Sequence, residues 1–230
     1  MFVKLRTVIT LVLAGMLMIS CQKELSLDAT TAGGTAAPCK SCSYIPWCNG
    51  SVYTYVDTTM GTGTTSITTL TIIKDTTIDG KIFQKFANPG ADGYYNCTDG
   101  VSTLIAYNVP SSGGPVIKVE QTELKANEGA GATWSNSMNN GLGQNVDYNY
   151  KIAGKGLSKT VLGVDYTNVI QVHLTISMTA PVIGTLVVGE ADYYYANNVG
   201  LIDNVIYTTN PFGGPPTVAL HRVLKTYSIP

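Results

Sequence analysis

The feature that most constrains the fold of this chain is a succession of short β-prone runs that starts at Tyr44 and continues to the C-terminus. The runs are rich in Val, Ile, Thr and Tyr, and Gly, Asn, Asp and Pro separate them, which is the pattern of a many-stranded antiparallel fold. Almost nothing in this region has helical periodicity. The expected strands are 51–57, 66–73, 81–87, 93–96, 102–108, 116–124, 147–154, 157–162, 164–177, 185–196, 201–207 and 218–227.

Two tight turns and three segment matches indicate an internal repeat. Asp79-Gly80 predicts a two-residue hairpin, because both central residues of a type I′ turn have positive φ. Gly163 lies in a similar place between two apolar residues. Residues 50–53 match 131–134, residues 77–83 match 160–166, and Tyr94-Tyr95, Gly100 and Tyr107 match Tyr193-Tyr194, Gly200 and Tyr207. The offset between the copies grows along the chain, so the second copy has an extra stretch around 171–189 that lengthens one hairpin.

Two copies of a meander pair most simply edge to edge, into one large curved antiparallel sheet. Sheets of more than about ten strands tend to curl or split. We therefore expect an all-β fold built from two repeated meanders, either an open barrel or a two-layer sandwich, with aromatic side chains on its concave side. Residues 44–230 are expected to form a single β domain with internal duplication.

Residues 1–21 have the pattern of an export signal rather than of folded structure. Lys4 and Arg6 precede an apolar run over residues 8–19, which is shorter than the roughly 20 residues of a membrane-spanning helix. The run ends at Met18-Ile19-Ser20-Cys21, which resembles a bacterial lipobox. This lipoprotein signal peptide predicts that Cys21 is lipidated and becomes the mature N-terminus, so that the protein is attached to a membrane through lipid.

Residues 22–43 have neither helical nor alternating periodicity and are expected to form a flexible tether. Gln22-Lys23-Glu24, directly after the cysteine, resembles the signal by which lipoproteins of the Bacteroidetes reach the cell surface; the alternative is an ordinary tether in the periplasm. We expect a lipid-anchored outer-membrane protein, and leave open whether it is exposed on the cell surface.

The stretch Tyr-Tyr-Tyr-Ala-Asn-Asn-Val-Gly-Leu-Ile at 193–202 also resembles known proteins. It is similar to a segment of many uncharacterised Bacteroidetes lipoproteins and of related barrel-like periplasmic proteins. The resemblance implies such a fold and transfers no activity or catalytic residue.

Charge narrows the classes of partner. Without residues 1–21 the chain has 12 basic and 15 acidic side chains, so it lacks the basic footprint of a nucleic-acid-binding protein. It equally lacks a polybasic patch for anionic lipid. The remaining partners are the membrane, through the acyl chains, and a glycan or protein ligand.

Four cysteines remain after the signal, namely Cys39, Cys42, Cys48 and Cys97. Export favours disulfides, and four cysteines allow three connectivities. We expect two bridges, one of which ties the 39–48 region to Cys97 and closes a long loop. Zinc binding and a redox Cys-x-x-Cys are weaker alternatives, since structural zinc sites usually have two spaced cysteine pairs and no βαβ pattern surrounds the motif.

Motifs for catalysis are missing from the sequence, which has no Gly-x-Ser-x-Gly elbow and no His-Glu-x-x-His. No metal or cofactor is expected. His173 alternates with apolar residues and is expected to face away from them. The acidic pairs without motif context are expected to be solvated surface charges; they are Asp192 with Asp203, and Glu120 with Glu123.

Aromatic residues cluster in two parts of the chain, where exposed rings would stack on sugars or on an apolar ligand, although strand aromatics mostly belong to a core. The candidate ligand-binding residues are Trp47, Tyr53, Trp134 and Tyr194. The sequence therefore favours a non-enzymatic, lipid-anchored envelope or surface protein that binds a ligand or partner. The alternative is a hydrolase of glycans or cell-wall material whose carboxylates come from distant strands.

Overall fold

The computed structural model describes residues 42–88, 91–108, 117–139, 145–180, 184–209 and 214–230. Within these ranges the chain forms twelve β-strands and no helix, hence no helix long and apolar enough to cross a membrane. The strands are β1 (Val52–Thr59), β2 (Thr64–Ile78), β3 (Lys81–Asn88), β4 (Ala91–Thr98), β5 (Val101–Asn108), β6 (Ile117–Lys125), β7 (Thr133–Asn139), β8 (Asn145–Val161), β9 (Val164–Ala180), β10 (Gly184–Ala196), β11 (Gly200–Thr208) and β12 (Thr217–Ser228).

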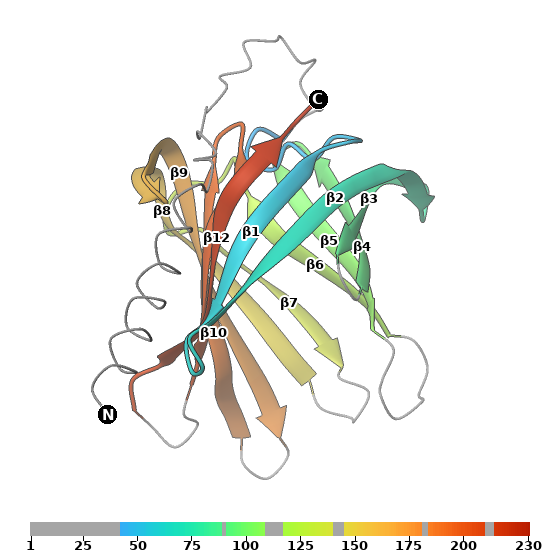
Figure 1. The fold of residues 1–230 in the computed structure, drawn as a ribbon. Helices are drawn as coiled ribbons and strands as arrows, with labels where there is room; N and C mark the ends of the chain where they lie inside the picture. Colours follow the sequence, from blue (N-terminus) through green and yellow to red (C-terminus); the bar gives the residue numbers. More distant parts are fainter. Residues whose placement is uncertain (1–41, 89–90, 109–116, 140–144, 181–183, 210–213) are drawn as a thin grey trace, which may run out of the picture. The chain divides into compact units, whose positions relative to one another are not determined.

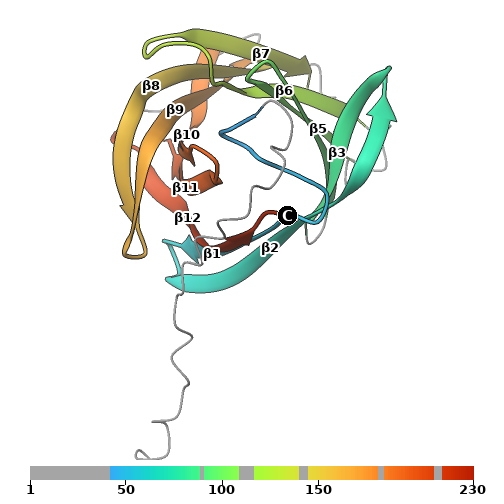
Figure 2. The ribbon, with the colours of Figure 1, turned by 90° about the horizontal axis from the view of Figure 1, so that it is seen from above.

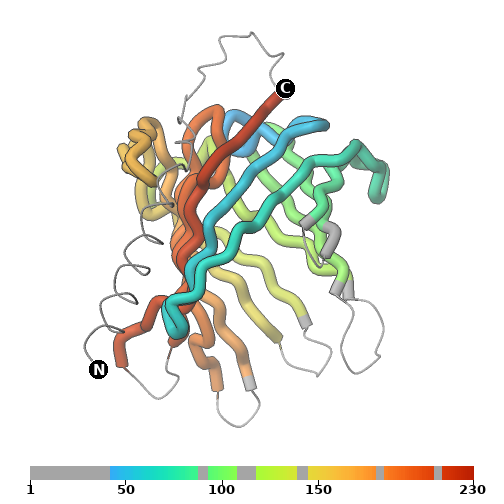
Figure 3. Tube along the Cα trace, viewed as in Figure 1, coloured from blue at the N-terminus to red at the C-terminus, as the bar shows by residue number. Residues whose placement is uncertain are grey.

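All twelve strands belong to one antiparallel sheet in the order β6-β5-β4-β3-β2-β1-β12-β11-β10-β9-β8-β7 (Figure 1). It consists of two six-stranded meanders, β1–β6 and β7–β12, joined where β1 pairs with β12. Figure 3 shows β1, in blue, running alongside β12, in red. Seen from above, the sheet curls until its two edges, β6 and β7, approach each other (Figure 2). Of the two expected forms of the all-β fold, the structure has the open barrel, nearly closed.

The segments that match in sequence occupy equivalent places in the two meanders. The amide of Gly50, just before β1, donates to the carbonyl of Ile72 at 2.9 Å, and the amide of Gly131, just before β7, donates to the carbonyl of Ile152 at 2.8 Å. Both glycines have positive φ, 86° and 92°. The same local geometry thus introduces the first strand of each meander, although duplication itself stays a prediction.

The two hairpin turns are also alike. Asp79-Gly80, between β2 and β3, has φ of 50° and 77°, and Leu162-Gly163, between β8 and β9, has φ of 49° and 81°. Positive φ at both positions is what a type I′ turn requires. The hairpin that follows is longer in the second meander, as expected, because β9 and β10 have 17 and 13 residues whereas β3 and β4 have 8 each.

The segment before β1, residues 42–50, lies inside the ring of strands (Figure 2), and we call it the plug. Its Tyr44 and Ile45 are buried in the main core cluster, which lines the inner face of the sheet. The hydroxyl of Tyr44 donates to Oδ1 of Asn168 on β9 at 3.0 Å, and the carbonyl of Pro46 accepts from the hydroxyl of Tyr53 on β1 at 3.0 Å. These bonds attach the plug to both meanders.

Two strand predictions were wrong. No strand was expected at β7, whose sequence Thr-Trp-Ser-Asn-Ser-Met-Asn is poor in β-branched residues; it forms because every residue pairs with β8. Two strands were expected where β8 is one, because Gly154 and Gly156 interrupt the pattern. In the structure, register shifts at this point let the strand continue.

Candidate functional site

Tyrosine rings from three strands face the interior of the barrel. Tyr95 on β4, Tyr150 on β8 and Tyr195 on β10 are buried members of the main core cluster, and Tyr193 packs against it from β10. Trp134 on β7 lies parallel to Tyr150, with ring centroids 5.3 Å apart. Aromatic rings therefore form much of the inner wall where the two edges of the sheet approach.

The two edges are joined by side chains instead of a backbone ladder, and we call this junction the seam. Nε1 of Trp134 donates to the carbonyl of Thr122 on β6 at 2.7 Å. The side-chain amide of Asn136 bonds to both backbone groups of Thr122. Its Oδ1 accepts from the Thr122 N–H and its Nδ2 donates to the Thr122 carbonyl, each at 3.2 Å. Two β7 side chains thus satisfy backbone groups of β6 that a paired strand would otherwise satisfy.

A β-bulge follows immediately at Glu123. On the neighbouring strand β5, Thr103 pairs with Thr122 and Ser102 pairs with Leu124, so that Glu123 is the extra residue of β6. A bulge sets two residues against one and re-aims a side chain. Leu124 is fully buried in the core cluster, and Glu123 is aimed into the same interior, where its charge acts on the inner-wall tyrosines.

Burial raises the pKa of the Glu123 carboxyl to about 7, because the charged form loses its hydration. Among the described residues it has no hydrogen-bond or ion-pair partner. Burial also raises the pKa of Tyr95, Tyr150, Tyr193 and Tyr195, and the charge of Glu123 raises each of them further. The carboxyl therefore lies within electrostatic reach of all four hydroxyls.

The opposite side of the interior has a carboxylate in very different surroundings. Nε and Nη2 of Arg222 on β12 donate to Asp57 on β1 at 2.7 and 2.8 Å, and the Thr68 hydroxyl donates to the same carboxylate at 2.6 Å. Burial raises the pKa of Asp57, but these hydrogen bonds outweigh burial and hold it below its usual value. Arg222 also lies over the ring of Tyr55, 5.4 Å from its centroid.

The two histidines, together with the carboxylates expected to be solvated, form pairs on the outer face. Nδ1 of His173 lies 3.0 Å from Oδ1 of Asp192, and Nε2 of His221 lies 2.9 Å from Oδ1 of Asp203. As expected, His173 faces away from its buried neighbours. The expectation of solvated charge was wrong for Asp203, which is 5% exposed and also bridges to Lys159 at 3.0 Å.

These pairs do not form a nucleophilic triad. No serine, threonine or cysteine within the described ranges hydrogen-bonds to either histidine. The hydroxyl of Tyr207 donates to Asp192 at 3.1 Å on the other carboxylate oxygen. Each carboxylate is occupied by its neighbours, so the arrangement stabilises the outer face. Groups of three or more metal-ligating side chains are likewise not found in the described part of the chain.

The four aromatic residues predicted to bind a ligand do not form one site. Trp47 packs in the plug, with its ring centroid 4.5 Å from that of Tyr95 and 6.4 Å from that of Tyr53. Trp134 is at the seam. Tyr194 is on the outer face, where Nζ of Lys159 lies 3.6 Å from its ring centroid. Of these, Trp134 is the one beside Glu123, which was expected in solvent. Sequence analysis missed its location because local sequence does not tell which face of β6 is the interior.

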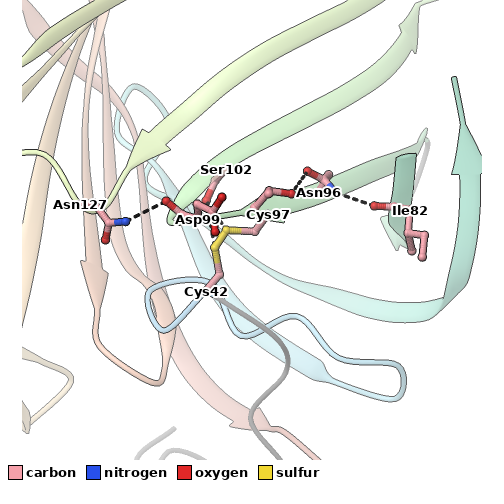
Figure 4. The surroundings of a disulfide bond; sticks show 8 residues. Cys42, Ile82, Asn96, Cys97, Asp99, Ser102 and Asn127 are labelled. Carbon is pink, nitrogen blue, oxygen red and sulfur yellow. Dashed lines mark hydrogen bonds between the residues drawn. A yellow bond between two sulfur atoms is a disulfide. The ribbon is translucent and has the colours of Figure 1, made fainter. Parts of the chain in front are cut away.

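The plug is tied to β4 by a disulfide between Cys42 and Cys97 (Figure 4). The buried hydroxyl of Ser102 lies beside both sulfurs, 3.5 Å from that of Cys97. This confirms a bridge from the 39–48 region to Cys97. Cys48 is disulfide-bonded as well. Cys21 and Cys39 lie outside the described residues, so lipidation and a bridge that includes Cys39 stay predictions.

Two solved structures show similar folds. A protein from Parabacteroides distasonis, provisionally assigned as a lipoprotein, has a TM-score of 0.50 and 13% identity, covering 82% of this chain and 99% of its own. A provisionally assigned exported protein with a YmcC-like fold from Bacteroides fragilis has a TM-score of 0.41 and 12% identity, covering 81% and 99%. No family model and no curated protein matches the sequence. At this identity the first likeness shows the fold alone.

Proposed function

We propose that this chain is an exported, lipid-anchored envelope protein without enzymatic activity, whose barrel interior binds a small, largely apolar ligand. The main support is the incomplete filling of the inner wall. Leu104, Trp134, Tyr148 and Tyr193 pack against the core cluster inside the ring and yet remain half-buried. Protein interiors are normally close-packed, so accessible surface on these side chains indicates room for a ligand.

Lipid anchoring rests on the lipobox at residues 18–21 and the tether that follows. The assignment of the Parabacteroides protein as a lipoprotein agrees with it. Two or three acyl chains would hold the protein firmly, because a single chain gives only marginal membrane binding. We place the protein at the outer membrane, and proteolysis of intact cells would tell whether it faces outward.

Anchoring is tested by incorporation of a labelled acyl precursor in the native host. The wild-type chain should be labelled and the Cys21→Ala variant should not. Cys39→Ala is the matched control, since it removes another cysteine near the N-terminus and should keep the label. If Cys21→Ala were still labelled, the anchor would be wrongly assigned.

Binding in the interior is tested with Nile red, a neutral dye that fluoresces in apolar surroundings. Leu104 lies on β5 opposite Tyr95 and faces the interior, so Leu104→Trp should fill space there and reduce dye binding severalfold. Tyr107→Trp, on the same strand, changes an exposed side chain and serves as control. Equal binding by both variants would place the dye outside the barrel and contradict the proposal.

A hydrolase is not favoured by the described residues. Acid hydrolysis of a glycoside needs two carboxyl groups roughly 5–10 Å apart. Asp57 is held by Arg222 and Thr68, and burial is the one cause that raises the pKa of Glu123, with no contribution from a second carboxylate. We therefore propose a binding role for the interior.

A further inference from the structure

Two polar groups inside the barrel are not used by the fold. The carboxyl of Glu123 makes no hydrogen bond or ion pair within the described ranges, and the buried hydroxyl of Tyr95 has no hydrogen-bond partner there, although Ser102 is nearby. Tyr95 is 1% exposed. The carboxyl of Glu123 is half-buried, so a ligand can reach it, whereas a fully buried hydroxyl without a partner, such as that of Tyr95, needs an explanation in a folded protein.

The two groups lie in the same part of the interior. Tyr95 pairs with Leu104 on β5, and Ser102, two residues away on the same face of β5, pairs with Leu124, the residue after Glu123. The strand register therefore brings Glu123 and Tyr95 to the same part of the inner face, in agreement with the effect of the Glu123 charge on the pKa of Tyr95. The other ionisable groups that face Glu123 are hydroxyls, those of Tyr150 on β8 and of Tyr193 and Tyr195 on β10. None of them is a cation.

The arginine of the interior is already engaged. Arg222 acts electrostatically on Tyr193, which Glu123 also influences, but its side chain donates two hydrogen bonds to Asp57. Its charge is therefore balanced at the other side of the interior. Lys125, two residues along β6, has its Nζ 5.8 Å from the ring centroid of Trp134, and within the described ranges neither it nor another cation forms an ion pair with Glu123.

Resting on the function proposed above, we propose that the interior binds an apolar amine, whose ammonium group donates hydrogen bonds to the Glu123 carboxylate and to the Tyr95 hydroxyl oxygen. An ammonium has three N–H donors and no acceptor, which matches two unpartnered oxygens. The apolar body of the ligand would contact the half-buried rings of the inner wall.

The test compares n-octylamine with n-octanol, which have the same chain length and differ in the cationic nitrogen. Binding to the mature chain is measured by titration calorimetry at pH 8, where octylamine is charged and Glu123 is ionised. We expect octylamine to bind about 10-fold to 100-fold more tightly, the range for a hydrogen bond to a charged group. Glu123→Gln should remove this preference while leaving octanol binding unchanged.

Glu120→Gln is the matched control. Glu120 lies on the same strand, is exposed, and pairs with Lys118 at 3.3 Å on the outer face. The Glu120→Gln substitution removes one negative charge from the same strand and should keep the preference for octylamine. In the wild type, affinity for octylamine should also rise between pH 5.5 and pH 8.5 as Glu123 ionises. This rise should be missing in Glu123→Gln. Because the comparison is between pH values within one variant, it does not depend on a difference in stability between the variants.

The outcomes separate the two proposals. Equal affinity for octylamine and octanol, or octylamine binding that Glu123→Gln does not weaken, would overturn the amine proposal and leave interior binding standing. Failure of Nile red, octanol and octylamine alike to bind would overturn the proposed function, and the amine site with it.

Discussion

The two meanders meet twice, and the two junctions are built on different principles. At the β1–β12 junction, all residues of β1 pair with β12, and Arg222 holds Asp57 across it with two hydrogen bonds. At the seam, Trp134 and Asn136 use side chains to satisfy a single residue of β6, Thr122. One junction is a backbone ladder along the whole of β1, with one bulge between Thr54 and Tyr55, and the other has two side chains in place of a ladder.

The inner carboxylates differ for the same reason. In the register of β1 against β12, Arg222 lies directly opposite Asp57, so this carboxylate faces a cation and its pKa is lowered. β6 has no laddered neighbour on its outer edge, and there Glu123 faces inward without a hydrogen-bond or ion-pair partner among the described residues. The carboxylate at the laddered junction thus stabilises the fold, whereas the one at the seam is the carboxylate that we propose binds a ligand.

The largest expected effect is at the β1–β12 junction. Arg222→Met leaves Asp57 buried without its cation and should lower the free energy of unfolding by about 3–5 kcal/mol. The measurement is urea denaturation at pH 7. The double variant Asp57→Leu/Arg222→Met removes both charges and should recover most of the loss, since the cost arises from the uncompensated charge. A loss below about 1 kcal/mol in the single variant would mean that this junction does not depend on the ion pair.

The disulfide provides a reference within the first meander, away from the β1–β12 junction. Cys97→Ala should lower the free energy of unfolding by about 2–4 kcal/mol, mainly by freeing the unfolded chain over a sequence separation of 55 residues. Its thermal midpoint should fall, and denaturation without reductant should reveal one reactive thiol, at Cys42. The loss should add to that of Arg222→Met, since the sites share no partner. Three reactive thiols would indicate that the second bridge depends on this one.

At the seam, Glu123→Gln should change the dependence of stability on pH. The pKa of this carboxyl rises from 4.5 to about 7 on folding, so the folded state binds its proton more tightly, and wild-type stability falls as pH rises from about 4.5 to about 7. The loss amounts to at most about 3 kcal/mol above that range. Denaturation midpoints at pH 5 and pH 8 should differ less in Glu123→Gln than in Glu120→Gln. An equal difference in both variants would place Glu123 in solvent.

The contribution of Asp57 to stability changes with pH in the opposite direction. Because folding lowers its pKa, its contribution to stability is present above the pKa of the unfolded carboxyl and is lost as pH falls through the folded value. Asp57→Asn should therefore weaken the protein at neutral pH and have less effect in acid. Denaturation over the same pH series separates the two inner carboxylates, and a loss that grows in acid would contradict the assignment.

The smallest expected effect tests the seam bonds themselves. Trp134→Phe keeps a ring against Tyr150 but removes the N–H that donates to Thr122, and should cost about 1 kcal/mol. Hydrogen exchange should become faster at amides of β6 and β7 and stay slow at β1 and β12. Faster exchange throughout the sheet would show that the seam is as much a part of the global fold as the ladder.

Most of the architecture was predictable from local sequence. Alternating β-branched and aromatic residues, together with turn residues such as Asp79-Gly80, predicted an all-β chain and the position of a type I′ turn. The matching segments predicted two meanders, and their strands lie in equivalent positions. Export of the chain favoured disulfides, and the one between Cys42 and Cys97 is present.

The site was less predictable, because it depends on pairing between distant strands. Glu120 and Glu123 are three residues apart, so strand alternation puts them on opposite faces, but which face is the interior, and that Glu123 has no partner there, depends on how β6 pairs with its neighbours. Asp203 looked like a surface charge, but Lys159 and His221, from two other strands, cover it. The partners of these carboxylates have no signal within a few residues of them.

The sequence by itself determined the strand-rich character of the chain, its main turns and its export signal, since these depend on backbone preferences and on short linear patterns. Tertiary structure decided which edges of the sheet meet, that a strand as polar as β7 forms at all, and which carboxylates are paired. The physical reason is that register, bulges and burial are properties of pairs of strands. A one-residue change in register reverses the side to which a residue points, and the pKa and binding capacity of its side chain change with it.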